Sequence, residues 1–173
     1  MSTEEKKNSQ ISLDSEILSP STEKEVSEIV REIYSKQLPI EITGTGTKKV
    51  FGYNLQTARK LTLSKLSGII DYKKEELYIK VKAGTPIQDI EKILDENNQE
   101  LAFEPIDFGY MINGQSNKGT IGGYVACNFA GSRRFKVGSV RDHILGFKGV
   151  NGKGDIIKSG GTVVKLSLIH ISE

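Results

Sequence analysis

The amino-acid sequence predicts an α+β protein in which two glycine-rich segments provide the candidate binding site. Two stretches, 22–35 and 85–97, repeat apolar residues at helical spacing, and several shorter ones have the pattern of strands. One glycine-rich segment, 44–49, directly follows a predicted strand, and the other covers 119–131. At 173 residues the chain is long enough for one good core, or for two small lobes around a cleft.

Composition and charge exclude several classes of protein. A hydrophobic content of 36% and a charged content of 27% are typical of a soluble globular protein, and a net charge of +2 is too small to favour nucleic acid or an anionic membrane. Cys127 is the only cysteine, which excludes an intrachain disulfide, and its small neighbours predict a packed core position. The sequence shows neither a bilayer-spanning apolar run nor a secretory signal, so we expect a cytoplasmic protein.

An amphipathic helix is predicted near the N-terminus. Residues 1–20 are polar and mixed in charge, so we expect a disordered tail there. Thr22 and Glu25 match a capping box, in which two side chains satisfy free N–H groups where a helix begins. The apolar residues that follow lie on one helical face, and they are Val26, Ile29, Val30, Ile33 and Tyr34.

The first glycine-rich segment directly follows a short predicted strand over residues 40–43. It reads Gly44-Thr45-Gly46-Thr47-Lys48-Lys49. Consecutive backbone N–H groups in such a loop can point at an anion, but a plain turn between two strands would look the same. The loop is not a Rossmann fingerprint, which needs a third glycine at Lys49. It is not a Walker loop either, which needs Gly-Lys followed by Ser or Thr.

The middle of the chain is predicted to combine strands with one helix. The helix begins at Thr85-Pro86, because proline suits the first turn, and ends at Asn97-Asn98. We expect strands at 61–63, 68–72, 77–84 and 101–103, a charged turn at 73–76, and a polar surface loop at 110–118.

The second glycine-rich segment, residues 119–131, has small residues in helical register. Gly122, Ala126 and Ala130 form one smooth stripe. Because glycine is costly inside a helix, the cluster indicates that another segment or a ligand approaches the backbone closely. Hydroxyl groups and positive charges follow over residues 132–142, which suits a phosphorylated cofactor. Tight helix–sheet packing beside a solvated basic loop would explain the same residues.

The last third of the chain is predicted to be mainly β-structure. We expect a hairpin of strands 144–150 and 155–158 around a turn at 151–154, and a further strand from 160 to 165. His143 and His170 are the only histidines, too few for a histidine-based metal site. We expect His143 to be a packed strand residue and not a base.

In chain order these motifs resemble a known flavoprotein family. The series that carries the resemblance is Gly44-Thr45-Gly46-Thr47-Lys48, Glu104-Pro105-Ile106-Asp107, Gly119-Thr120-Ile121-Gly122-Gly123, Ser132-Arg133-Arg134, Gly138-Ser139-Val140-Arg141-Asp142 and Gly160-Gly161-Thr162-Val163-Val164-Lys165. Over residues 25–165, roughly, it is similar to the FAD-binding domain of vanillyl-alcohol-oxidase/p-cresol-methylhydroxylase (PCMH) flavoproteins. Within that family it looks most like the FAD-binding subunits of glycolate oxidases (glycolate dehydrogenases).

The resemblance implies a two-lobed PCMH-type fold with FAD lying extended between the lobes. After a disordered tail over 1–20, the first lobe would be a small βαβ unit over residues 21–110. The second lobe, over 111–165, would be a mixed or antiparallel α/β unit that is truncated at its C-terminus. Some relatives attach the flavin through histidine, but neither glycine segment contains one, so we expect non-covalent FAD.

The resemblance also assigns residues to the cofactor. Backbone amides of 44–48 would wrap the pyrophosphate, Pro105 and 119–123 would lie along it towards the flavin, and Val164 would sit near the adenine. The full set is Gly44, Thr45, Gly46, Thr47, Lys48, Pro105, Gly119, Thr120, Ile121, Gly122, Gly123, Asn128, Ser132, Arg134, Gly138, Asp142 and Val164. Ile106 stands where the family has a second proline, a small loss of rigidity.

The function that the resemblance implies is oxidation of glycolate or a similar 2-hydroxy acid. The full protein would pass a hydride equivalent to FAD and electrons to partner subunits, including an iron–sulfur subunit, in the cytoplasm or at the inner face of the membrane. Catalytic residues would belong to a substrate-binding cap that follows this segment, so none is named. No metal or nucleic acid is expected.

Three other functions compete with this interpretation. A cell-wall precursor reductase that uses FAD and NADPH shares the fold, although the run from Ser132 to Asp142 favours the first function. The chain could also be a flavin-binding module without turnover. A nucleic-acid-binding domain, suggested by basic residues at 133–141, is disfavoured by the near-neutral net charge and by the lack of an aromatic series for stacking.

The end of the chain departs from the family. Residues 166–173 read Leu-Ser-Leu-Ile-His-Ile-Ser-Glu, which looks like the in-frame translation of a transposase adapter used in sequencing libraries. We therefore expect an adapter-derived tail on a truncated reading frame. A genuine terminal strand is the alternative, and the encoding DNA would separate the two.

Overall fold

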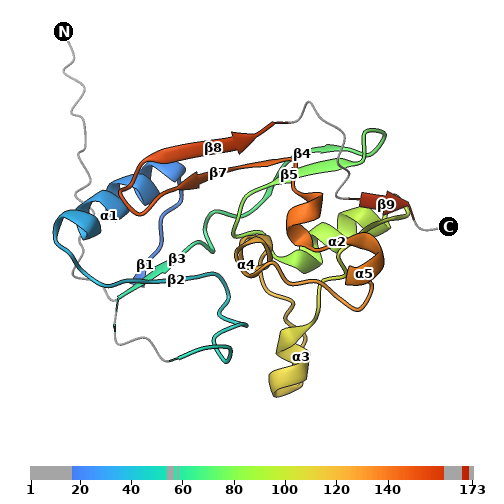
Figure 1. Ribbon diagram of the computed structural model, residues 1–173, viewed down its shortest axis with the longest axis horizontal. Helices are drawn as coiled ribbons and strands as arrows, with labels where there is room; N and C mark the ends of the chain where they lie inside the picture. Colours follow the sequence, from blue (N-terminus) through green and yellow to red (C-terminus); the bar gives the residue numbers. More distant parts are fainter. Residues whose placement is uncertain (1–16, 54–56, 58, 162–168, 172–173) are drawn as a thin grey trace, which may run out of the picture.

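The computed structural model describes residues 17–53, 57, 59–161 and 169–171 (Figure 1). The helices are α1 (Glu23–Ser35), α2 (Ile87–Asp95), α3 (Phe108–Asn113), α4 (Ile121–Cys127), α5 (Arg134–Val137) and the 3-10 helix η1 (Val140–His143). The strands are β1 (Ile17–Leu18), β2 (Glu41–Thr43), β3 (Lys60–Thr62), β4 (Ile69–Lys73), β5 (Tyr78–Val81), β6 (Gln99–Leu101), β7 (Gly146–Val150), β8 (Ile156–Gly160) and β9 (Ile169–Ile171).

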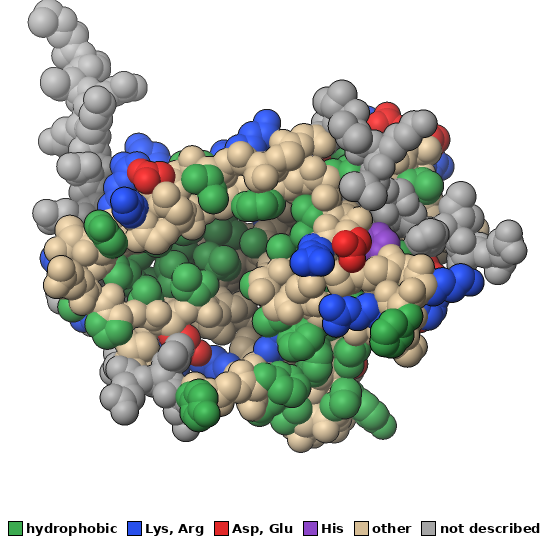
Figure 2. Space-filling model, in the orientation of Figure 1, with side chains coloured by type: hydrophobic (Ala, Val, Ile, Leu, Met, Phe, Trp, Pro, Cys, Tyr) green, Lys and Arg blue, Asp and Glu red, His purple; other side chains and the backbone are tan. Residues whose placement is uncertain are grey.

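One hydrophobic core lies between α1 and a parallel sheet of order β1-β3-β2. The predicted cap at Thr22 is confirmed, because the Thr22 side chain accepts a hydrogen bond from the Glu25 N–H. The Glu25 carboxylate accepts the N–H of Ser21, one residue before the position that a capping box requires. The core residues are Leu18, Val26, Ile29, Ile33 and Leu61. Figure 2 shows an apolar hollow between α1 and the strands β2 and β3, a groove of 550 Å³.

The disordered tail predicted over residues 1–20 includes a short strand at its end. Ile17 and Leu18 form β1, which pairs in parallel with Lys60 and Leu61 of β3. Leu18 is only 3% exposed, so its burial holds the strand in place. A pair of apolar residues at the end of a polar segment has no periodicity, which is why the sequence pattern did not indicate a strand here.

A second core holds α2 against the β4–β5 hairpin, α4 and η1. Its members come from residues 69–144, whereas the first core is built from 18–66 and Val150. The chain therefore changes core between Leu66 and Ile69, earlier than the lobe boundary expected after residue 110. The hairpin β4–β5 and helix α2 are confirmed, but Pro86 is the N-cap of α2 and not a residue of its first turn.

Three local expectations were wrong. The expected surface loop 110–118 begins as α3, which Gly114 ends with a φ of 74°. Cys127 is exposed and not packed in the core. His143 is buried as expected, but in η1 and not in a strand, with its Nε2 2.8 Å from the Val137 carbonyl oxygen. Helices this short leave no repeat in the sequence to predict them.

The C-terminal hairpin β7–β8 is confirmed and lies along α1 (Figure 1). Ser27 of α1 donates a hydrogen bond to the Gly154 carbonyl, and Lys148 pairs with Glu23. Most of the strand expected over 160–165 lies outside the described residues. Ile169–Ile171 pair antiparallel with β6, as the alternative of a terminal strand expects, and the adapter origin of this tail stays a prediction.

Candidate cofactor site

The loop Gly44–Lys48 presents unused backbone donors. Within the described part of the chain, none of its amides donates a hydrogen bond. The next amide, that of Lys49, donates to the Gly46 carbonyl at 3.2 Å and closes the turn, with Gly46 at a φ of +75°. Successive N–H groups without protein acceptors form a concavity that binds anions. We call residues 44–48 the anion cradle.

A half-buried ammonium group stands at the anion cradle. Lys48 Nζ lies 4.1 Å from the ring centroid of Tyr124 and 5.3 Å from that of Phe108. Burial lowers the pKa of Lys48, and the nearby Cys127 opposes this in part. Among the described residues no carboxylate pairs with Lys48, whereas the neighbouring Lys49 pairs with Glu41 at 2.7 Å. Besides the two rings, Lys48 Nζ contacts Thr47 Oγ1 in a long hydrogen bond of 3.5 Å. An ammonium held by aromatic faces and one hydroxyl remains available to an anionic ligand.

The second glycine-rich segment packs directly on the anion cradle. A Cβ added to Gly119 would lie 2.7 Å from Thr47 Oγ1 and 3.0 Å from Lys48 Nζ. A Cβ added to Gly44 would collide with the Thr120 side chain. A Cβ added to Gly123 would lie 3.5 Å from Thr120 Oγ1 and 3.7 Å from Lys48 Nζ, so a side chain fits there in ordinary van der Waals contact. Bare backbone thus lines one side of the anion cradle.

The amides of this second segment are largely used within the protein. Gly119 donates to Asn117 Oδ1 at 3.0 Å, Ile121 to the Thr85 carbonyl at 3.0 Å, and Gly122 to the Ala83 carbonyl at 2.9 Å. A Cβ at Gly122 would lie 2.7 Å from the Ala83 oxygen, so Gly122 serves tight packing, the alternative interpretation of the stripe. The segment therefore offers a ligand a smooth surface and few donors.

Three of the predicted cofactor residues hold the turn before η1. Asp142 accepts hydrogen bonds from the Ser139 N–H at 2.7 Å and from its hydroxyl at 2.8 Å, and these bonds lower the pKa of Asp142. Gly138 has a φ of +88° and packs on the Asp142 carboxylate. Asn128 Oδ1 accepts from the Arg141 N–H at 3.0 Å. Their contacts are those of local structure.

The segment 131–134 is fixed to the chain before Pro105. Glu104, at a φ of 47°, accepts a hydrogen bond from the Arg133 N–H at 2.9 Å. The Arg133 guanidinium lies 3.1 Å from Glu100 and 3.8 Å from Glu104. Arg133 is thus engaged in the protein, while the exposed Arg134 has no ion-pair partner in the part of the chain that is described. Val164 lies outside the described residues.

Aromatic residues that the sequence did not single out form the floor below Lys48. Tyr124 is fully buried, its hydroxyl donates to the Ile106 carbonyl, and burial raises its pKa strongly. Phe51 stacks edge-on against Phe108, with 5.3 Å between the ring centroids. These rings come from separate segments, and only Tyr124 lies inside a glycine-rich stretch, so no pattern in the sequence indicated that they would meet.

Other kinds of site find no support in the described part of the chain. Its His, Cys, Asp and Glu side chains form no cluster able to hold a metal ion. None of its helices is long and apolar enough to cross a bilayer.

Comparison with known proteins connects this geometry to flavoproteins. A family model described as an FAD binding domain matches residues 15–160. The glycolate oxidase subunit GlcE of Escherichia coli is 36% identical over 138 residues, which cover 80% of this chain and 37% of the relative. A D-lactate dehydrogenase of Anaerostipes hadrus is 31% identical, over 83% of this chain and 28% of the relative. The chain thus spans about a third of the length of these relatives.

Solved structures agree on the fold. Alkyldihydroxyacetonephosphate synthase has a TM-score of 0.61 and 17% sequence identity, covering 86% of this chain and 27% of that one. A likeness at this identity concerns the fold alone. It supports the α+β, PCMH-type architecture that the order of motifs predicted.

Proposed function

Because this chain belongs to the family of FAD binding domains, we propose that its full-length protein is a flavoprotein dehydrogenase that oxidises glycolate or a similar 2-hydroxy acid. FAD is the cofactor. The observation that carries the substrate class is the 36% identity with a glycolate oxidase subunit. Other relatives are named for D-lactate and for D-2-hydroxyglutarate, which are also 2-hydroxy acids.

The anion cradle is the proposed site for the pyrophosphate of FAD. Its unpaired amides and the Lys48 ammonium supply donors and positive charge, and Gly123 leaves room for close approach. A bulky side chain at Gly123 would fill that space, whereas one at Gly119 would collide with Thr47 and Lys48. The residues present therefore fit a diphosphate, and we propose that binding is non-covalent.

The chemistry of the cofactor determines which roles fall to the flavin and which to the protein. Bound flavin supplies the acceptor for a hydride equivalent, and the protein binds and orients it. We propose that this chain supplies binding, and that the residues contacting the 2-hydroxy acid belong to the rest of the full-length protein. Alone, the 173-residue chain would be a flavin-binding module without turnover.

Partner subunits are part of the proposal. Two relatives, GlcE and GlcD, are named as subunits of glycolate oxidase. We propose that electrons leave the flavin towards other subunits, an iron–sulfur subunit among them. Reduction of an iron–sulfur cluster by glycolate in the purified complex would test this step.

A flavin-retention experiment tests the cofactor site first. The chain is incubated with excess FAD, desalted, and its visible absorbance recorded. Retained flavin bands, released as intact FAD on denaturation, are expected. A folded sample that retains none would contradict the cradle assignment.

Turnover of the full-length protein tests the substrate. Reduction of an artificial electron acceptor is followed with glycolate, D-lactate and D-2-hydroxyglutarate in parallel. The highest kcat/KM is expected for glycolate, and inactivity with all three acids would contradict the proposed reaction.

A further inference from the structure

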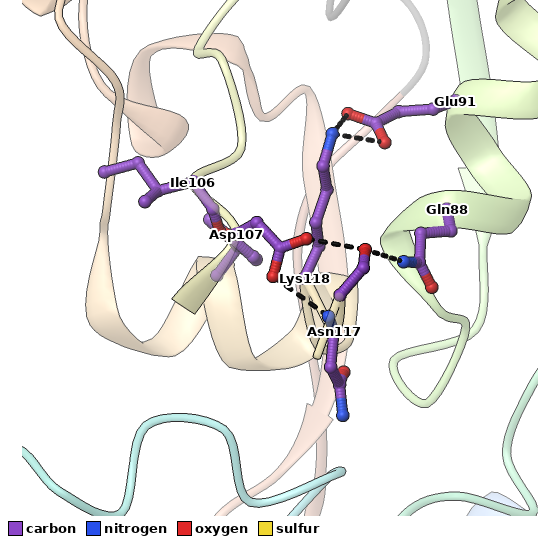
Figure 3. Close-up of polar contacts among 8 residues, drawn as sticks. Gln88, Glu91, Ile106, Asp107, Asn117 and Lys118 are labelled. Carbon is purple, nitrogen blue, oxygen red and sulfur yellow. Dashed lines mark hydrogen bonds and ion pairs between the residues drawn. The ribbon is translucent and has the colours of Figure 1, made fainter. Parts of the chain in front are cut away.

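A polar network centred on Asp107 ties the segment after α3 to α2 (Figure 3). Asp107 Oδ1 accepts hydrogen bonds from the N–H groups of Tyr110 and Asn117, both at 2.9 Å. Its Oδ2 accepts one from the Ser116 hydroxyl at 2.7 Å, and Gln88 of α2 donates to the same hydroxyl oxygen at 2.9 Å. One carboxylate thereby fixes three points of the chain.

Asn117 connects this network to the anion cradle. Its Oδ1 accepts the N–H of Gly119 at 3.0 Å. Gly119 is the residue whose bare Cα faces Thr47 and Lys48, and its φ of +86° restricts the position to glycine. Two hydrogen bonds and one van der Waals contact therefore separate the Asp107 carboxylate from the anion cradle.

Both ends of this path are held by further contacts. Lys118 Nζ lies 2.8 Å from each carboxylate oxygen of Glu91, which anchors the segment before Gly119 to α2 (Figure 3). The Ile106 carbonyl, next to Asp107, accepts the hydroxyl of the fully buried Tyr124. Asp107 thus cannot drift from its position without breaking contacts in the core.

We propose that Asp107 is a positioning residue for the anion cradle. By holding Asn117, it sets the depth at which Gly119 lies against the loop and so the space left for phosphate beside Lys48. The inference rests on the proposed cofactor function and adds a residue that does not touch the cofactor. If Asp107 served only as the cap of α3, its loss would change stability and leave cofactor affinity unchanged.

The test compares FAD with riboflavin, which lacks phosphate groups. Dissociation constants of both are measured by flavin fluorescence for the 173-residue chain and for Asp107→Ala, with folding checked by circular dichroism. FAD affinity should fall about tenfold, as for the loss of one hydrogen bond to a charged group, and riboflavin affinity should not change. Asp107→Asn should restore FAD binding, because its amide oxygen still accepts both N–H groups.

A double-mutant cycle tests the path through Asn117. If Asp107 acts by way of Asn117, Asp107→Ala and Asn117→Ala should each weaken FAD binding, and the double variant should be no weaker than the weaker single one. Gln88→Ala is the matched control, since it removes an outer member of the network that bonds to Ser116 and leaves the hydrogen bonds from Asn117 to Asp107 and from Gly119 to Asn117 in place, and it should bind FAD normally. If Asp107→Ala fails to fold, Asn117→Ala tests the path to Gly119 by itself. This variant keeps Asp107 as the cap of α3, so the helix should stay intact.

Three results would overturn the inference. An unchanged FAD dissociation constant in folded Asp107→Ala or Asn117→Ala would reduce Asp107 to a helix cap. Strictly additive losses in the cycle would exclude a shared path. Equal affinity of the unmodified chain for FAD and riboflavin would show that the anion cradle does not bind phosphate. That result would contradict the proposed cofactor site, and it needs no Asp107 variant.

Discussion

Lys48 Nζ lies 4.1 Å above the ring of the fully buried Tyr124, and no carboxylate among the described residues pairs with it. The adjacent Lys49 is bound to Glu41 at 2.7 Å. Consecutive lysines thus have opposite roles, because one charge is neutralised within the protein and the other faces the anion cradle. The relationship gives a matched pair of side chains with which to test phosphate binding.

Replacing Lys48 by methionine should weaken FAD binding without unfolding the protein. The flexible thioether can pack on the Tyr124 and Phe108 rings, while the charge that attracts phosphate is lost. We expect FAD affinity to fall by about tenfold or more, and riboflavin affinity to stay within about twofold. Isothermal titration at two salt concentrations measures both, with Lys49→Met as the control. Equal losses in the two variants would contradict a specific role for Lys48.

The neighbouring glycines Gly122 and Gly123 should respond differently to a side chain. Gly122→Ala places its Cβ about 2.7 Å from the Ala83 oxygen, so it should destabilise the fold by about 1–2 kcal/mol in urea unfolding. Gly123→Leu places its Cβ beside Lys48 in ordinary van der Waals contact, so it should keep stability but lower FAD affinity on the order of tenfold. If Gly122→Ala were neutral in stability, its assignment to packing would be wrong.

Much of the fold could be predicted because its longer elements have strong local signals. The Thr22 cap and the apolar face of α1 gave that helix, and the turn at Asn151 gave the last hairpin. The elements that were missed are short. Neither β1 nor α3 is long enough to show a period, and their stability comes from tertiary contacts such as the burial of Leu18 and the capping by Asp107.

The candidate site was predictable in position but not in its division of roles. The sequence pointed to two glycine segments, and the structure brings Gly44–Lys48 and Gly119–Gly123 together. The sequence could not indicate which amides already donate within the protein. The Gly122 amide, for example, donates to the Ala83 carbonyl, which lies far away along the chain. For the same reason the aromatic floor of Phe108 and the Asp107 network became visible only in three dimensions.

Asp142 should make stability depend on pH in the acid range. Its hydrogen bonds from Ser139 lower its folded-state pKa below the ordinary 3.8, so the carboxylate contributes stability above that value. This contribution should be lost as the pH falls below about 4, through the folded-state pKa. Urea unfolding from about pH 7 to about pH 3 should show the advantage over Asp142→Asn shrinking at acid pH. A constant difference across this range would contradict the assignment.

Glu104 should stabilise the segment that carries Ser132 and Arg134. Glu104→Ala removes the acceptor of the Arg133 N–H and one of its ion partners, so the free energy of unfolding should fall by about 1–2 kcal/mol. Glu104→Gln keeps an acceptor oxygen and loses only an exposed ion pair, which should cost less than about 1 kcal/mol. Urea unfolding measures both, and hydrogen exchange at the Arg133 amide should accelerate only in the alanine variant. If the two variants were equally destabilised, the ion pair and not the backbone hydrogen bond would hold the segment.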